Sequence, residues 1–79
     1  MKTLHGVFAS RVNLNSSAIA LVAYDHHRWL FLVEFRDGAV YLYRDVPPAV
    51  YDALLSAPSQ GAYFNRTIRD TYAYSRYEA

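Results

Sequence analysis

Two tyrosines and two arginines stand at spacings that place each pair on a common face. Tyr41 and Tyr43 are two residues apart in an apolar run, and alternate residues of a β-strand share one face of the sheet. Arg66 and Arg69 are three residues apart, which makes them neighbours on a helix. Aromatic rings stack on bases and arginines hold phosphates, so these pairs point to contacts with RNA, single-stranded nucleic acid or a nucleotide.

Neighbouring residues extend this candidate site. Asn65 precedes Arg66 and can add hydrogen bonds, while two further tyrosines follow Arg69. The expected nucleic-acid or nucleotide-binding residues are therefore Tyr41, Tyr43, Asn65, Arg66, Arg69, Tyr72 and Tyr74.

Each part of this site has a structural alternative. Tyrosine fits half-buried sheet surfaces. Tyr41 and Tyr43 therefore lie in the core if the helices cover their face, and they lie open if the helices cover the opposite face. Arg66 can instead pair with Asp70, four residues further on. The sequence leaves both alternatives open.

The residues that usually carry catalysis are absent or scattered. The chain has no cysteine, and its histidines are His5 and the adjacent pair His26-His27, which falls in an expected loop. Two adjacent histidines alone do not complete a metal site. Ser16, Asp25 and His26 can be written as a triad, but they lack a nucleophile elbow and an oxyanion-loop signature. We therefore expect a protein that is not an enzyme and that holds no metal or cofactor.

Composition bounds the size and setting of the fold. Seventy-nine residues with 53% hydrophobic and 16% aromatic content make one small domain whose core depends on large side chains. The lack of cysteine and of an apolar leader predicts a cytoplasmic location, and the apolar runs are too short to span a membrane. The net charge of +1 is small for a dedicated DNA binder, so any nucleic-acid contact is local or carried by stacking.

Strand patterns occupy the middle of the chain. Apolar and alternating runs predict strands over residues 19–24, 29–35 and 39–44. A loop at Asp25-His26-His27 and a tight turn at Asp37-Gly38 join them, which implies an antiparallel meander. Trp29 is expected to anchor the core. Residues 1–11 form either an N-terminal arm or an edge strand, and residues 12–79 form the domain.

Helix signals follow the strands. Proline lacks the amide hydrogen of a sheet ladder but suits the first turn of a helix, so Pro48 is expected to open a helix over residues 48–57. Ser59 can cap a second helix over residues 60–69, and residues 71–79 form a strand or an ordered coil. The expected fold is α+β, with a small antiparallel three- to four-stranded β-meander followed by two short helices packed on one face.

A series of short motifs runs from about residue 12 to residue 74. They are Asn15-Ser16-Ser17-Ala18-Ile19, Tyr24-Asp25, Val33-Glu34-Phe35, Gly38, Tyr41-Leu42-Tyr43, Val46-Pro47-Pro48-Ala49-Val50-Tyr51, Gly61-Ala62-Tyr63-Phe64-Asn65, Ile68-Arg69 and Tyr72-Ala73-Tyr74. In this order they resemble the KTSC domain, a module found at the C-terminus of some lysyl-tRNA synthetases and as stand-alone bacterial and phage proteins.

The resemblance implies a module of unknown function for which RNA binding has been conjectured. After Ile68-Arg69 the family tends to have a glycine, a basic residue and Tyr-Pro-Tyr, whereas this chain has Asp70, Thr71 and Tyr72-Ala73-Tyr74. These changes add a negative charge and remove a positive one, which disfavours phosphate binding at that corner. The alternative function is a protein-interaction module, or a homo-oligomer that pairs through an edge strand.

Overall fold

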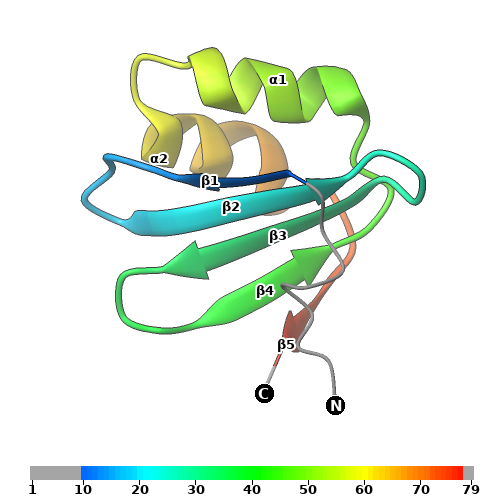
Figure 1. The fold of residues 1–79 in the computed structure, drawn as a ribbon, viewed down its shortest axis with the longest axis horizontal. Helices are drawn as coiled ribbons and strands as arrows, with labels where there is room; N and C mark the ends of the chain where they lie inside the picture. Colours follow the sequence, from blue (N-terminus) through cyan, green and yellow to red (C-terminus); the bar gives the residue numbers. More distant parts are fainter. Residues whose placement is uncertain (1–9, 78–79) are drawn as a thin grey trace.

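The computed structural model describes residues 10–77, which form one antiparallel sheet with helices on one face (Figure 1). The five strands lie in the order of the chain: β1 (Ser10–Asn13), β2 (Ile19–Asp25), β3 (Leu30–Phe35), β4 (Val40–Tyr43) and β5 (Tyr74–Tyr77). Between β4 and β5 come α1 (Pro48–Ser56), α2 (Gln60–Tyr63) and the π-helical turn η2 (Phe64–Ile68). The expected α+β class, with an antiparallel meander and two short helices on one face, is confirmed.

The sheet has more strands than the three or four expected, because both outer segments pair with the meander. β1 joins β2, with Val12 opposite Val22. β5 joins β4, with Tyr74 opposite Tyr43. A short polar or mixed segment carries a weak strand pattern of its own, and the neighbouring strand supplies the ladder that orders it. The expected N-terminal arm lies largely outside the described residues, since β1 begins at Ser10.

The strand register decides which face the tyrosines occupy. Phe31 of β3 lies opposite Tyr24 on one side and Tyr43 on the other. All three side chains are buried in the cluster that also contains residues of α1 and η2. Tyr41 and Tyr43 therefore lie on the face that carries the helices, here called the helix-side face. Tyr43 is only 3% exposed, while Tyr41 is half-buried at the edge of the cluster.

Aromatic side chains fill the core between the sheet and the helices. The Tyr51 ring of α1 stacks on Tyr24 with 4.7 Å between ring centroids. Phe64 of η2 contacts Phe31, Phe35 and Tyr43 through ring contacts of 5.5 to 6.4 Å. Large aromatic residues thus supply the buried area that a domain of this size needs.

Trp29 does not anchor the core, and the expectation that it would was wrong. β3 begins one residue later, at Leu30, and Trp29 closes the preceding turn with a φ of 56°. This left-handed conformation breaks the strand alternation that would have turned the indole inward, and the side chain is 43% exposed. The backbone carbonyl of Trp29 accepts the amide of Val46, which holds the turn against the segment before α1.

The second helical segment is not one continuous α-helix. Ser59 caps α2 as expected, because its hydroxyl accepts the amide of Ala62 at 3.3 Å. After Tyr63 the chain widens into the π turn, in which the carbonyl of Phe64 accepts the amide of Arg69 at 2.9 Å. The wider turn keeps both Phe64 and Ile68 buried against the sheet. Such π turns are often found at functional sites.

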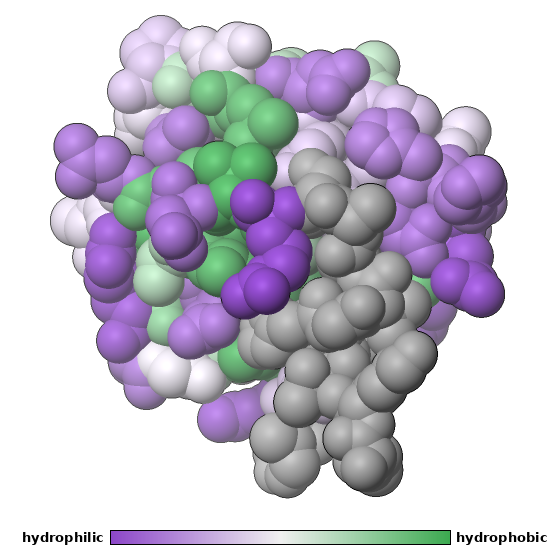
Figure 2. Space-filling model, viewed as in Figure 1, coloured by the Kyte–Doolittle hydropathy of each residue, from purple (hydrophilic) through white to green (hydrophobic). Residues whose placement is uncertain are grey.

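The opposite face of the sheet carries a second, smaller apolar cluster. Ala23 and Leu32 are buried there, and further aliphatic side chains of β2, β3 and β4 are half-buried around them, namely Leu21, Leu30, Val40 and Leu42. In the view of Figure 2, hydrophobic side chains gather in a band bordered by hydrophilic ones. Both faces of the central strands are therefore apolar, as their sequences indicate.

Candidate functional site

A groove of about 420 Å³ opens on the helix-side face between β4 and the segment of residues 64–70. We call it the β4 groove. Its lining contains most of the residues expected at a binding site, namely Tyr41, Tyr43, Asn65, Arg69 and Tyr74. Sheet, π turn and C-terminal strand each contribute, so residues far apart in the sequence meet here.

Tyrosine rings form one wall of the β4 groove. Tyr74 lies edge-on to Tyr41, with 5.7 Å between centroids and an interplanar angle of 77°. It also packs against Tyr43 at 5.1 Å and 30°. Tyr43 is buried beneath it, whereas Tyr74 is 53% exposed. The wall therefore combines a fixed buried ring with an open aromatic surface that a planar ligand can stack on.

The π turn supplies the polar side of the groove. Asn65 and Arg69 are both exposed and line the groove, four residues apart. Arg66 points elsewhere, with its guanidinium carbon 5.8 Å from the centroid of the Tyr63 ring. Among residues 10–77 it forms no ion pair with Asp70 either, so the structural alternative for Arg66 is not made. The fourth expected tyrosine, Tyr72, is half-buried against the core and does not line the groove.

Acidic groups outnumber cations in the lining of the β4 groove. Arg69 contributes one positive charge, and Asp37 and Asp70 contribute negative ones. The Asp37 carboxylate accepts the amide of Ala39 at 3.0 Å and so belongs to the β3–β4 turn. A polyanion thus gains little from the local field, and the aromatic wall is the stronger feature of the site.

The buried ring of Tyr43 keeps its proton at neutral pH. Burial, and to a smaller extent the neighbouring Tyr74, raise the pKa of Tyr43 to about 12. Its hydroxyl donates to the backbone carbonyl of Arg69 at 3.4 Å. This contact links the floor of the groove to the end of the π turn that carries the arginine.

Five lining residues were not predicted as site residues, namely Phe35, Asp37, Ala39, Phe64 and Asp70. Phe35 and Phe64 form an edge-on contact at 5.5 Å at the base of the groove, and Asp37 lies at its rim. The signal for Phe35 was available, because a tight turn at Asp37-Gly38 places it on the same face as Tyr41. The position of Phe64 depends on how the helical segment packs, which strand alternation does not reveal.

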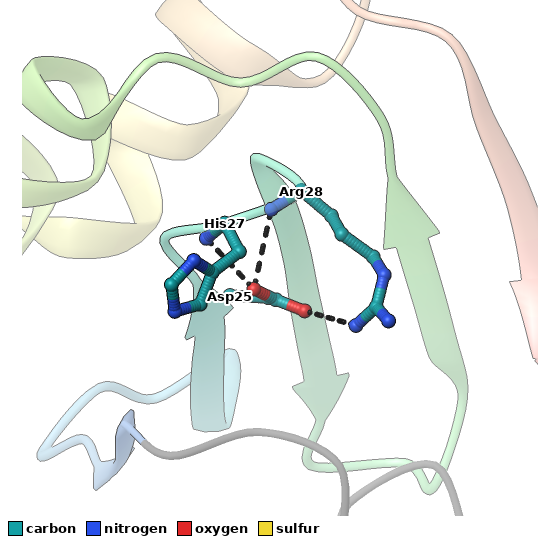
Figure 3. A network of polar contacts seen from close by, with 3 residues as sticks. All are labelled: Asp25, His27 and Arg28. Carbon is teal, nitrogen blue, oxygen red and sulfur yellow. Dashed lines mark hydrogen bonds and ion pairs between the residues drawn. The ribbon is translucent and has the colours of Figure 1, made fainter.

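The loop that holds His26 and His27 is organised around a carboxylate (Figure 3). Asp25 accepts the backbone amides of His27 and Arg28 at 2.9 and 3.2 Å, and its second oxygen accepts the Arg28 guanidinium at 3.0 Å. Burial raises the pKa of Asp25, but these bonds outweigh it and the pKa lies below its usual value. Both oxygens of the Asp25 carboxylate thus stabilise the turn between β2 and β3.

Within residues 10–77 no group of three His, Cys, Asp or Glu side chains is placed to hold a metal ion. In this part of the chain, no helix has the length and apolar character that crossing a lipid bilayer requires.

An antiparallel sheet with two short helical segments on one face defines a small α+β domain. A model of the KTSC domain family matches residues 15–72. The crystal structure of a KTSC domain protein from Yersinia pestis superposes with a TM-score of 0.84 at 26% identity, covering 87% of this chain and 97% of that one. The chain therefore belongs to the KTSC domain family, as its motifs indicate.

Relatives of known sequence agree with this assignment. An uncharacterised protein of Stutzerimonas stutzeri is 44% identical over 59 residues, which are 75% of this chain and 83% of that protein. A protein of Tsukamurella paurometabola is 39% identical over 59 residues, which are 75% of this chain and 88% of that protein. Neither name indicates a catalytic activity.

A lysine–tRNA ligase of Nostoc punctiforme is also similar. It is 35% identical over 60 residues, which are 76% of this chain but only 11% of the ligase. The similar region is thus a small part of that enzyme.

Proposed function

We propose that this domain is a non-catalytic module that binds a nucleotide, or one nucleotide of single-stranded RNA, in the β4 groove. The observation that carries the proposal is the open ring of Tyr74 beside Asn65 and Arg69 in one groove. A base is held by a flat aromatic surface and by hydrogen bonds at its edge, and its phosphate by a cation. A relative that is a tRNA ligase and a chain without cysteine, as in a reducing cytoplasm, fit this proposal.

The charges of the lining set the expected strength and type of binding. Because Arg69 is the one cation among the described lining residues and Asp37 and Asp70 oppose it, the phosphate is held by a single contact that adds less than stacking does. Each phosphate contact to a single strand lowers the logarithm of the affinity by about 0.7 per tenfold rise in salt, so one contact gives a shallow salt dependence. Stacking on Tyr74 contributes about 1–3 kcal/mol per base. Binding is then modest, and duplex DNA, whose bases are already stacked, binds poorly.

The test uses two arginines that differ in placement but not in charge. AMP and a short single-stranded RNA are titrated against the wild type, Arg69→Ala and Arg66→Ala at low and high salt, by calorimetry. Arg69→Ala is expected to weaken binding, because its side chain lines the groove. Arg66→Ala is the matched control, because its guanidinium lies over Tyr63 outside the groove.

Two results would refute the proposal. The first is equal binding of the wild type and Arg69→Ala; the second is an absence of binding by the wild type at low salt. In either case the protein-interaction or self-association function becomes the better hypothesis. That hypothesis is supported by the second apolar cluster and by the strands at the two sheet edges. Sedimentation over a range of protein concentrations measures self-association.

A further inference from the structure

A second groove, of about 470 Å³, lies beside the first. It is formed by the loop of residues 15–18 and the segment of residues 58–62. Asn65 lines this groove as well as the β4 groove, so the two meet at that side chain. We infer that the second groove holds the ribose of the neighbouring nucleotide on the same strand and makes the domain prefer RNA to DNA. The inference rests on the proposed function of the β4 groove.

The lining of the second groove is polar and uncharged. Hydroxyls and amides are supplied by Asn15, Ser16, Ser17, Ser59, Gln60 and Asn65. A phosphate would need a cation, and a base would need an aromatic surface, and neither occurs among these lining residues. Neutral donors and acceptors instead match the sugar, whose 2′-hydroxyl both donates and accepts a hydrogen bond.

The polar groups divide into those that build the groove and those that remain available. The Ser16 hydroxyl accepts the amides of Ala18 and Ile19, each at 3.2 Å. It thereby fixes the loop that forms one wall. Within residues 10–77, the exposed side chains of Asn15, Ser17 and Asn65 form no hydrogen bond. They are therefore the groups that can turn to a ligand without breaking a bond inside the domain.

The loop wall is also held in place from behind. The Arg36 guanidinium donates to the carbonyls of Leu14 and Ser16 at 2.8 and 3.0 Å, and its backbone amide donates to the carbonyl of Ala18 at 2.9 Å. These bonds tie the loop to the end of β3. A groove whose walls are already ordered loses less conformational entropy when a ligand binds.

Gly61 faces the loop wall of the second groove. A Cβ atom on Gly61 would lie 3.6 Å from the Ser16 hydroxyl oxygen. This is ordinary contact, so alanine fits there, but a longer side chain at this position would extend into the space between the walls.

The experiment compares RNA and DNA probes of equal length. The dinucleotide ApA, its deoxy counterpart, AMP and dAMP are titrated against the wild type, Asn15→Ala/Ser17→Ala and Ser75→Ala. Ser75 faces the other side of the sheet, opposite Leu42, and is the control for loss of a serine outside both grooves. The mononucleotides report any sugar preference of the β4 groove itself.

We expect the wild type to bind ApA about three- to tenfold more tightly than deoxy-ApA, the effect of one hydrogen bond. Asn15→Ala/Ser17→Ala should abolish this preference while AMP binds unchanged, and Ser75→Ala should retain it. Equal binding of the two dinucleotides by the wild type, or a preference that survives in the double variant, overturns the inference.

Failure of the proposed function gives a different pattern. If AMP does not bind but ApA binds with the preference and loses it in the double variant, the second groove is supported and the β4 groove is not.

Discussion

Two pairs of contacting tyrosines between the sheet and the helical segments differ in how far they are exposed. Tyr24 and Tyr51 stack at 4.7 Å, both are buried, and the Tyr24 hydroxyl donates to the carbonyl of Val46. Tyr41 and Tyr74 meet edge-on at 5.7 Å, and more than half of Tyr74 is exposed. The residue type is the same in both pairs. The first pair contributes to stability because it is buried between the sheet and α1, while the second lies where a ligand can reach it.

The position of the helical segments causes this difference. α1 packs on β2 and β3 through Tyr51, which contacts Tyr24 and Phe31. η2 contacts β3 and β4 through Phe64. β5 lies at the far edge of the sheet in Figure 1, beyond α1 and α2. The helical segments thus leave part of the helix-side face uncovered near β4 and β5, and the β4 groove lies there.

The largest effect is expected from a core substitution in the covered region. Phe31 is fully buried and contacts Tyr43, Tyr51 and Phe64. Phe31→Ala should lower the free energy of unfolding by about 3–5 kcal/mol, because it removes buried area and leaves a cavity. Tyr74→Ala should lower it by about 0.5–1.5 kcal/mol, since the ring is half-exposed and loses its contacts with Tyr41 and Tyr43. Urea denaturation of the two variants measures both, and a similar loss in each would remove the distinction between the two regions.

The next effect concerns binding rather than stability. Tyr74→Ala should weaken the binding of AMP by about 1–3 kcal/mol, because it removes the open stacking surface. Trp29→Ala is the control, since Trp29 is also exposed, at 43%, but does not line the groove. Calorimetric titration of both variants gives the result. A loss of affinity in Trp29→Ala equal to that in Tyr74→Ala would contradict the assignment of the site.

A smaller effect is expected at alkaline pH. The pKa of Tyr43 is raised by burial from 10.0 to about 12. The unfolded chain therefore loses this proton at a lower pH than the folded domain does. Stability from this group is complete below pH 10 and is lost as pH rises from 10 to 12. Thermal denaturation should show a shallower decline over this range in Tyr43→Phe than in the wild type, and parallel curves would show that Tyr43 is not the group responsible.

The smallest effect is expected at the loop of His26 and His27. The pKa of Asp25 lies below its ordinary value of 3.8 because hydrogen bonds to the carboxylate outweigh its burial. The charged form stabilises the folded state above pH 3.8, and this contribution is lost as pH falls through the lowered pKa. Asp25→Asn should therefore be less stable than the wild type at neutral pH, and the difference should shrink in acid. A constant difference in melting temperature across that range would argue against a charged Asp25.

Local rules in the sequence account for much of the fold. Gly38 has a φ of 95° in the β3–β4 turn, as the Asp37-Gly38 pair indicates. Pro48 opens α1, and Ser59 caps α2. Each of these features depends on one residue and its near neighbours, such as the freedom of glycine at positive φ or the missing amide hydrogen of proline. The same holds for Tyr41 and Tyr43, which share a face because they are alternate residues of one strand.

Only the tertiary structure decided which of these side chains the helices cover and which line a groove. No property of Tyr41 or Tyr43 fixes which face of the sheet the helices cover, since both faces of β3 and β4 are apolar. Arg66 and Arg69 look equivalent in sequence, but the π turn places only Arg69 in the groove. Asn65 joins two grooves whose walls come from segments more than forty residues apart, such as Asn15 and Gln60. Such contacts depend on packing between distant elements, which no local pattern of side chains specifies.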